Sequence, residues 1–363
     1  MKKELLLIVL LFLTIAVSTH ALERPDVEFK VFQFPPENIP HIDGKTADWD
    51  IIGEDYTYRT DQLDGTTGGY DDGNVDPADL DISVKVGWVK GLNRLYFLYE
   101  AYDDYWDFAL FDVSRGYRND IFEISLDADI SGGQFINNEQ IEDKVENYLK
   151  FSGVHAQNYH IFTPPINNQW CMVWGGNPWI GWFPWAHQAY DYNFKPGEDG
   201  KLILEFWVTP FDYAPNDGPV RAVISKLTEN DIIGLSWAVL DFDNGKKDGI
   251  GNSNLAHERM SVQNGSALCA FRLMPIEEEY LPDIEARFTF KIVDMDQRLV
   301  YFKDESIGNI SKWTWHFGDG ETSNEQNPIH QYLKPSINHN ILLEVKGPDG
   351  MSRFSRHREV LIK

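Results

Sequence analysis

"DISVKVGWVKGLNRLYFLYEAYD", residues 81–103, contains two apolar runs separated by one short break. From Ile82 to Trp88 every second residue is apolar, which is the period of a β-strand with one face in a core. The break at 91–93 holds Gly and Asn, residues that favour tight turns. The stretch therefore predicts a hairpin of two antiparallel strands.

The same strand pattern recurs along the chain, at 120–129, 201–210, 232–241 and 266–274. Polar, glycine-bearing segments separate these runs, as in a protein of many short strands. One helix is predicted, at 137–151, where apolar residues recur at helical spacing. The chain is therefore predicted to be all-β, with antiparallel β-sandwiches as its architecture.

The first 21 residues have the features of a signal peptide. Lys2 and Lys3 precede an apolar run from Leu5 to Val17, and small residues follow at 19–21. The run is too short to span a bilayer, no later segment is long and apolar enough, and no lipoprotein Cys follows. We therefore predict a secreted or extracytoplasmic protein. A formal net charge of -25 excludes nucleic acid as the partner, since its binding requires cationic patches.

A second module is predicted after a short linker at 277–283, where prolines at 275 and 282 flank three glutamates. Within it, "WHFGDGETSNEQNPIHQY" (315–332) resembles the signature of polycystic-kidney-disease (PKD) domains, although "KPSINHN" (334–340) departs from the usual pattern. The resemblance implies an immunoglobulin-like sandwich over 284–363, serving as a spacer or as a contact to other secreted or cell-surface proteins. The residues that carry it are Trp315, Phe317, Gly318, Asp319, Gly320, Ser323, Asn327, Pro328, His330 and Tyr332; of these, Trp315, His330 and Tyr332 are predicted to be core or turn residues.

The first module, 22–276, opens with "HIDGKTADWD" (41–50), an Ile-Asp-Gly turn leading to an Asp-Trp pair. Together with the ordered strand series that follows, it resembles family 9 carbohydrate-binding modules (CBM9). DOMON-type sandwiches share this shape. The resemblance implies a β-sandwich that binds a polysaccharide or oligosaccharide, often with structural calcium.

"QWCMVWGGNPWIGWFPWAH", 169–187, holds five of the chain's twelve tryptophans among glycines and prolines. The C–H face of a sugar stacks on an aromatic ring, and tryptophan offers the largest ring. We expect outward-facing rings here to bind the sugar. The alternative is that they plug the end of the sandwich. The candidates are Trp174, Trp179, Trp182 and Trp185.

Trp106 directly follows the strand 95–103 and is predicted to clamp the sugar from a second loop. Asp103 and Asp104 are expected to accept hydrogen bonds from its hydroxyls. Calcium ligation or strand capping is the equal alternative for these two carboxylates.

Acidic, glycine-bearing loops are the candidates for calcium, which prefers oxygen ligands. "DADISGG" (127–133) offers Asp127, Asp129 and Ser131, and "DFDNGKKDG" (241–249) offers Asp241 and Asp243. A third loop spans 70–81. The alternative is that these are solvated turns.

Cys171 and Cys269 are the only cysteines, and the sequence allows either a disulfide between them or two free thiols.

No catalytic residue is assigned. A glycosidase needs two carboxylates flanking a cleft, and in so acidic a chain a suitable-looking pair carries little weight. Haem held by Met172 with His160 or His187 is a third possibility. The prediction is a secreted, non-catalytic carbohydrate-binding protein; the alternatives are a structural or adhesive surface protein and a glycan-active enzyme.

Overall fold

The computed structural model describes residues 22–67, 75–109, 112–136, 153–242, 251–281, 283–335 and 339–357. The chain divides into two compact units, 1–276 and 277–363, and each is treated by itself. The boundary coincides with the start of the predicted linker. Within the described ranges, no helix is long and apolar enough to cross a membrane.

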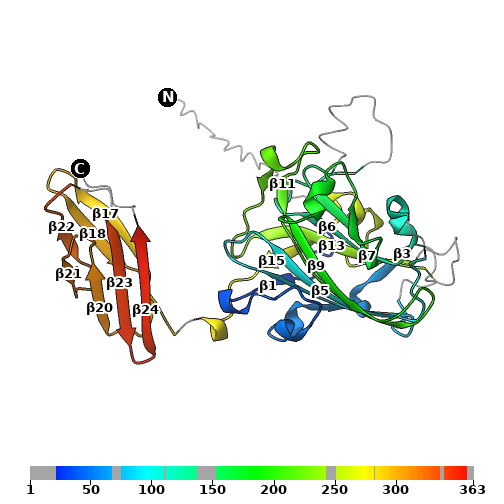
Figure 1. Ribbon diagram of the computed structural model, residues 1–363, viewed down its shortest axis with the longest axis horizontal. Helices are drawn as coiled ribbons and strands as arrows, with labels where there is room; N and C mark the ends of the chain where they lie inside the picture. Colours follow the sequence, from blue (N-terminus) through cyan, green and yellow to red (C-terminus); the bar gives the residue numbers. More distant parts are fainter. Residues whose placement is uncertain are drawn as a thin grey trace, which may run out of the picture. The chain divides into compact units, whose positions relative to one another are not determined.

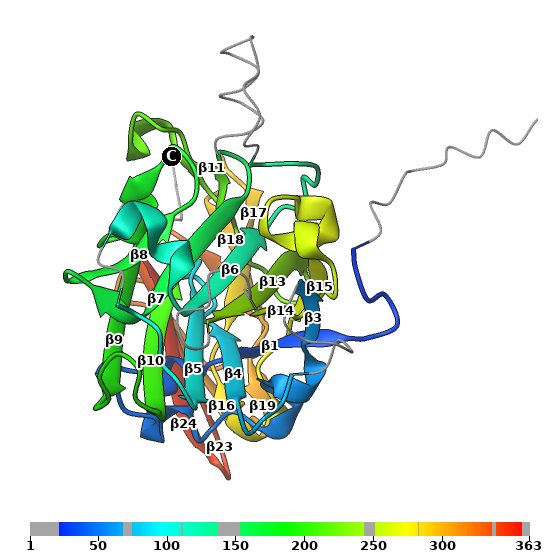
Figure 2. The same cartoon turned by 90° about the vertical axis from the view of Figure 1, so that its right-hand side faces the viewer.

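Two large sheets and one small strand pair, β11 (Phe211–Tyr213) with β12 (Val223–Ile224), build the N-terminal unit (Figures 1 and 2). Sheet A and sheet B are joined by β1 (Phe29–Gln33), whose first half pairs with β15 and whose second half pairs with β4. Sheet A has the order β8 (Gln169–Val173), β7 (Gln157–Ile166), β6 (Ile121–Asp127), β13 (Ile232–Asp241), β15 (Cys269–Leu273), with β14 (Gly251–Asn254) and β3 (Asp64–Thr67) at one side. Sheet B has the order β4 (Leu80–Trp88), β5 (Leu95–Asp103), β10 (Gly200–Val208), β9 (Ala186–Tyr192), with β2 (Thr57–Arg59) beside β4.

The two sheets pack through aromatic side chains. Tyr99 of β5 stacks on Phe122 of β6 with ring centroids 4.2 Å apart, and Phe97 stacks on Phe206 within sheet B at 4.7 Å. The residues between them alternate to the outside, as the period of two requires. The predicted all-β sandwich and the hairpin of β4 and β5 are confirmed. The helix predicted at 137–151 lies outside the described residues, and the described ranges contain only short 3-10 helices.

A buried carboxylate explains the "HIDGKTADWD" turn. Glu205 of β10 is fully buried, and its Oε2 accepts hydrogen bonds from the backbone N–H groups of residues 43, 44 and 45. Its Oε1 accepts one from Trp49 Nε1 at 2.6 Å. Gly44 has φ +83°, and a Cβ there would lie 3.0 Å from the Tyr190 carbonyl oxygen. Only glycine therefore suits this position.

The C-terminal unit has a three-stranded sheet, a four-stranded sheet and one short strand pair. Trp315 is buried between the two larger sheets, against Phe288 and Phe302, and its Nε1 donates to the Glu325 carbonyl at 2.9 Å. Tyr332 is also buried, so both are core residues as predicted. The sheets are β17 (Phe288–Asp294), β18 (Leu299–Asp304), β22 (Ile329–Gln331), and β21 (Thr322–Ser323), β20 (Lys312–His316), β23 (Asn340–Gly347), β24 (Gly350–His357); the pair is β16 (Ile284–Glu285) with β19 (Ile307–Gly308).

His330 closes the Asp319–Gly320 turn. Its ring stacks on Phe317 with centroids 4.0 Å apart, and its Nε2 lies 2.8 Å from Asp319 Oδ2. It is therefore the turn residue that the signature predicts.

Candidate functional site

The tryptophan-rich stretch is partly regular structure. It begins in β8, passes through a 3-10 helix, η6 (Pro178–Gly181), and ends in β9. Trp170 is 1% exposed, and its Nε1 donates to the Gly181 carbonyl at 2.7 Å. The first tryptophan therefore belongs to the core.

Trp179 and Trp185 close one end of the core. Their rings meet edge to face at 5.7 Å, and both contact Phe211 of β11 (Phe211–Tyr213). Trp179 Nε1 donates to the Pro215 carbonyl at 2.7 Å. Both rings are half-buried, so for this pair the structure favours the plug over an open platform.

Trp182 and Trp174 are the two remaining tryptophans of this stretch. Trp182 is 47% exposed and its neighbour Phe183 is 77% exposed. Trp174 is half-buried and packs against the small cluster of Phe135, Ile136 and Ala156.

Trp106 lies in the core. It is 1% exposed, stacks on Phe194 with ring planes 3° apart, and donates from Nε1 to the Gly200 carbonyl at 3.0 Å. The prediction that this ring clamps a sugar is wrong, because both its faces are covered.

A buried polar cluster lies on the outer face of sheet A, next to Trp174. The ring of His160 on β7 meets Trp174 edge to face at 5.4 Å, and its Nε2 lies 2.9 Å from Oε1 of Glu123 on β6. Asn158 Nδ2 donates to the same oxygen at 2.7 Å. Asn158 Oδ1 and both ring nitrogens of His160 have no hydrogen-bond partner among the described residues, although Nε2 lies within ion-pair distance of Glu123. Met172 lies opposite His160 across β7 and β8, as the haem hypothesis needs, but Glu123 occupies the Nε2 side of the ring.

Two 3-10 helices cover the same outer face. η5 (Val113–Arg118) contacts β7 and β8, and η8 (Arg259–Val262) contacts β6 and β13. The Val262 carbonyl accepts a hydrogen bond from Asn158 Nδ2 at 3.0 Å. Each helix exposes one large side chain, Tyr117 at 38% and Met260 at 37%. Neither helix carries a site residue predicted from the sequence, because the strands that each helix contacts are distant from it in the chain.

Three carboxylates meet where the two sheets end. Asp103 of β5, Asp120 before β6 and Asp241 of β13 are all buried, and each offers an oxygen within 4.8 Å of the others. Asp120 also accepts hydrogen bonds from the backbone N–H groups of Asp107 and Phe242. Burial and the two neighbouring carboxylates raise the pKa of Asp120 well above its ordinary value. A hard cation with oxygen ligands fits this arrangement.

The other predicted acidic positions are placed differently. Asp104 is exposed. Asp127 is buried and closes its own loop, accepting from the N–H groups of Ser131 at 3.1 Å and Gly132 at 2.7 Å. Burial raises the pKa of Asp127 to about 6. Calcium at Asp127, Asp129 and Ser131 stays a prediction. Asp243 and residues 70–74 lie outside the described residues.

Cys171 and Cys269 are free, buried thiols. They lie on β8 and β15, with three strands of sheet A between them. The disulfide alternative is therefore wrong for this structure. Burial raises the pKa of Cys269 to about 12, so the thiol stays protonated at neutral pH.

Comparison with known proteins bears on the C-terminal unit first. Residues 284–361 match the PKD domain family model. The PKD1 domain of the Vibrio cholerae metalloprotease PrtV is 25% identical, and the match covers 22% of this chain and 96% of that one, with a TM-score of 0.20. The PKD resemblance is confirmed.

Similar solved structures for the larger unit include a CBM9 module from Caldicellulosiruptor kristjanssonii in complex with cellotriose. It is 15% identical, with a TM-score of 0.43, and the match covers 70% of this chain and 97% of that one. A putative carbohydrate-binding protein from Bacteroides uniformis is 9% identical, with a TM-score of 0.37, over 68% of this chain and 98% of that one. No curated protein matches the chain.

Proposed function

We propose that the N-terminal unit binds carbohydrate on the outer face of sheet A, beside Trp174. One observation carries the proposal: a half-buried tryptophan ring lies against His160, which belongs to a buried polar cluster with Glu123 and Asn158. A sugar needs both features, an apolar ring for its C–H face and fixed polar groups for its hydroxyls.

The polar cluster has capacity left for a ligand. A buried polar atom without a partner costs roughly 1–3 kcal/mol, and both Asn158 Oδ1 and His160 Nδ1 are such atoms among the described residues. Both atoms are buried in this structure, so a ligand hydroxyl reaches them only when the side chains that cover them move aside; it then donates to Asn158 Oδ1 and, depending on the imidazole tautomer, donates to or accepts from His160 Nδ1. Tyr117 and Met260, exposed on the flanking helices, supply apolar surface at the rim.

Trp182 and Phe183 form a second aromatic surface, from which a longer glycan would gain further stacking. We assign the weaker contact to Trp182 and Phe183, because no buried polar side chain among the described residues forms a contact with either ring. Backbone hydrogen bonds join Trp182 to both Trp179 and Trp185, at 3.3 and 2.8 Å.

We also propose that calcium binds Asp103, Asp120 and Asp241. Three carboxylates at this spacing repel one another when ionised, and a divalent cation removes the repulsion. The ion would link sheet B to sheet A and fix the segment that leads into β6 and Glu123. Its role is structural.

The proposal for the whole chain combines the two modules. The protein is proposed to be exported and non-catalytic, with its PKD domain as a spacer or a contact to other surface proteins. The competing function is a structural or adhesive protein without sugar binding.

A glycan array of the full chain tests the proposal, with cellotriose, the ligand of the Caldicellulosiruptor module, among the probes. We expect one glycan class to bind in calcium and to bind more weakly in chelator, with no new reducing ends over time. Trp174→Ala should lose most of the affinity, and Trp182→Ala should lose less. If a folded sample bound no glycan on the array, the adhesive function would be favoured. Release of reducing ends would favour an enzyme.

A further inference from the structure

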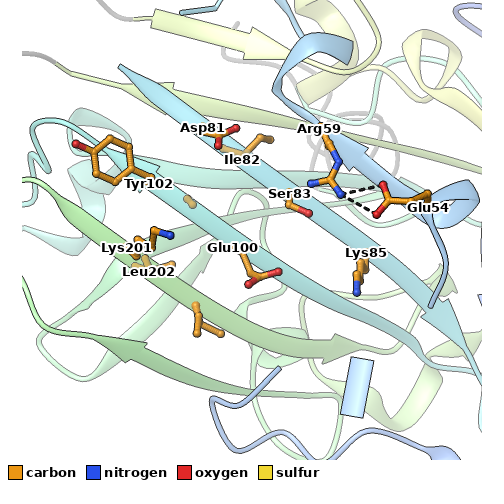
Figure 3. Close-up of a pocket in the computed structure, with 12 residues that line it drawn as sticks. Glu54, Arg59, Asp81, Ile82, Ser83, Lys85, Glu100, Tyr102, Lys201 and Leu202 are labelled. Atoms are coloured by element: carbon orange, nitrogen blue, oxygen red, sulfur yellow. Dashed lines mark hydrogen bonds and ion pairs between the residues drawn. The ribbon is translucent and has the colours of Figure 1, made fainter. Parts of the chain in front are cut away.

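The outer face of sheet B carries a groove that none of the assignments above uses. It has a volume of about 410 Å³, within the usual range of small-ligand pockets of about 300–1,000 Å³. One row of paired residues crosses its floor: Arg59 of β2, Ser83 of β4, Glu100 of β5 and Ile203 of β10. The next row is Asp81, Tyr102 and Lys201, which Figure 3 shows beside the first.

Several side chains of the groove lining are fixed by contacts of their own. Arg59 Nη2 donates to both carboxylate oxygens of Glu54, at 3.0 and 2.8 Å. Lys85 Nζ donates to the Trp49 carbonyl at 3.0 Å. Asp81 Oδ1 accepts from the hydroxyl of Thr60 at 3.0 Å. These groups are held in place before any ligand arrives, which lowers the entropy cost of binding.

Three other side chains of the lining are not fixed in this way. The side chains of Glu100, Tyr102 and Lys201 form no hydrogen bond or ion pair with any described residue, and Figure 3 shows Glu100 over the middle of the strands that form the floor. They offer a carboxylate acceptor, a hydroxyl and an ammonium donor on neighbouring strands. The Tyr102 ring and Ile203 add apolar surface between these polar groups.

We propose that this groove is a second glycan subsite, which binds a short segment of a neutral, hydroxyl-rich oligosaccharide. The charges of its lining cancel, since Glu54, Asp81 and Glu100 balance Arg59, Lys85 and Lys201, although the chain as a whole carries -25. A lining that is locally neutral and rich in both donors and acceptors suits hydroxyls better than a charged ligand. The inference rests on the proposed sugar binding. It adds that one chain holds two glycan segments, on opposite sheets, and gains avidity for a polymer.

Calorimetric titration of the full chain with cellotriose and other neutral trisaccharides, in calcium, tests the inference through stoichiometry. The wild type should bind two equivalents, and Trp174→Ala should bind one. Glu100→Gln with Lys201→Gln should remove the other equivalent, or weaken it at least about tenfold. A charge-matched control, Glu37→Gln with Lys226→Gln, changes exposed residues of the same unit outside the groove and should bind two. A trisaccharide of uronic acids should bind the groove more weakly.

The outcomes separate the two proposals. One equivalent in the wild type, lost in Trp174→Ala and kept in the groove variant, overturns the second subsite and leaves the proposed function intact. One equivalent lost only in the groove variant supports the groove and overturns the site beside Trp174. No binding by any folded sample across the panel overturns both.

Discussion

Glu205 and Glu123 are both buried glutamates on the outer faces of the sheets, and their surroundings differ. Glu205 accepts four hydrogen bonds, three from one turn of backbone and one from Trp49. Glu123 shares one oxygen between Asn158 and His160, and both of these side chains keep a buried atom without a partner among the described residues. A fully satisfied carboxylate holds the fold together, whereas a partly satisfied polar cluster has capacity for a ligand.

The largest effect on stability should come from replacing Glu205, whose carboxylate accepts four hydrogen bonds. Glu205→Ala leaves four donors without their acceptor and should lower the free energy of unfolding of the N-terminal unit by about 3–5 kcal/mol. Urea unfolding followed by tryptophan fluorescence measures it. Glu205→Gln keeps the shape and loses only the charge, so it should cost less. Equal stability of the alanine variant and the wild type would contradict a structural role for the hydrogen bonds that Glu205 accepts.

Calcium should have the next largest effect. At 100 times its dissociation constant, a ligand of the folded state adds about 2.7 kcal/mol of stability. The wild type should therefore melt higher in calcium than in chelator, and Asp120→Asn should show no such difference. In chelator the stability of Asp120→Asn reflects two opposing changes, because the amide removes carboxylate repulsion but keeps only one of the two acceptor oxygens that the Asp107 and Phe242 N–H groups use. Asp104→Asn, a change at an exposed neighbour, should keep the calcium response; if it also lost it, the ion would lie elsewhere.

Glu123→Gln tests whether Glu123 serves sugar binding more than stability. We expect sugar affinity to fall about tenfold or more while the free energy of unfolding changes by less than about 1 kcal/mol, since an amide still accepts from Asn158. Titration calorimetry and urea unfolding on the same sample measure the two quantities. A large loss of stability with unchanged affinity would show that Glu123 stabilises the fold, as Glu205 does, and does not contribute to sugar binding.

The smallest effect concerns the histidine–carboxylate pair of the PKD domain. Partial burial opposes ionisation of Asp319, but the hydrogen bonds from His330 and the Glu321 N–H outweigh it and lower the pKa of Asp319. The stability it contributes is complete above the unfolded pKa of about 4 and is lost as the pH falls through the lower folded pKa. Asp319→Asn should remove this loss, which is up to about 1 kcal/mol. Acid unfolding followed through the Trp315 indole NMR signal checks it; an unchanged acid limb would contradict the assignment.

Local patterns predicted the strands well. The runs at 95–103 and 232–241 coincide with β5 and β13, because alternation along one strand is a property of neighbouring residues. The PKD signature also placed Trp315 and Tyr332 in a core.

The site was harder to predict, because its geometry joins distant segments. Nothing in the spacing of 169–187 distinguishes Trp170, which β8 turns into the core, from Trp182, which η6 leaves exposed. Asp120 gains its significance only when β5 and β13 bring Asp103 and Asp241 to it. Trp106 follows the end of β5, and its burial depends on residues from other segments, among them Phe194, which stacks on its ring.

The strand shared by the two sheets also constrains the order of assembly. Phe29 of β1 pairs with Phe271 of β15, so the sandwich closes only when the last strand of the unit is available. A chain still emerging from the ribosome lacks that partner and keeps an open sheet edge. Folding dominated by such distant pairings is slow. The first strands therefore wait for β15 before the sandwich can close, and a chain exported as proposed above would cross the membrane before that closure.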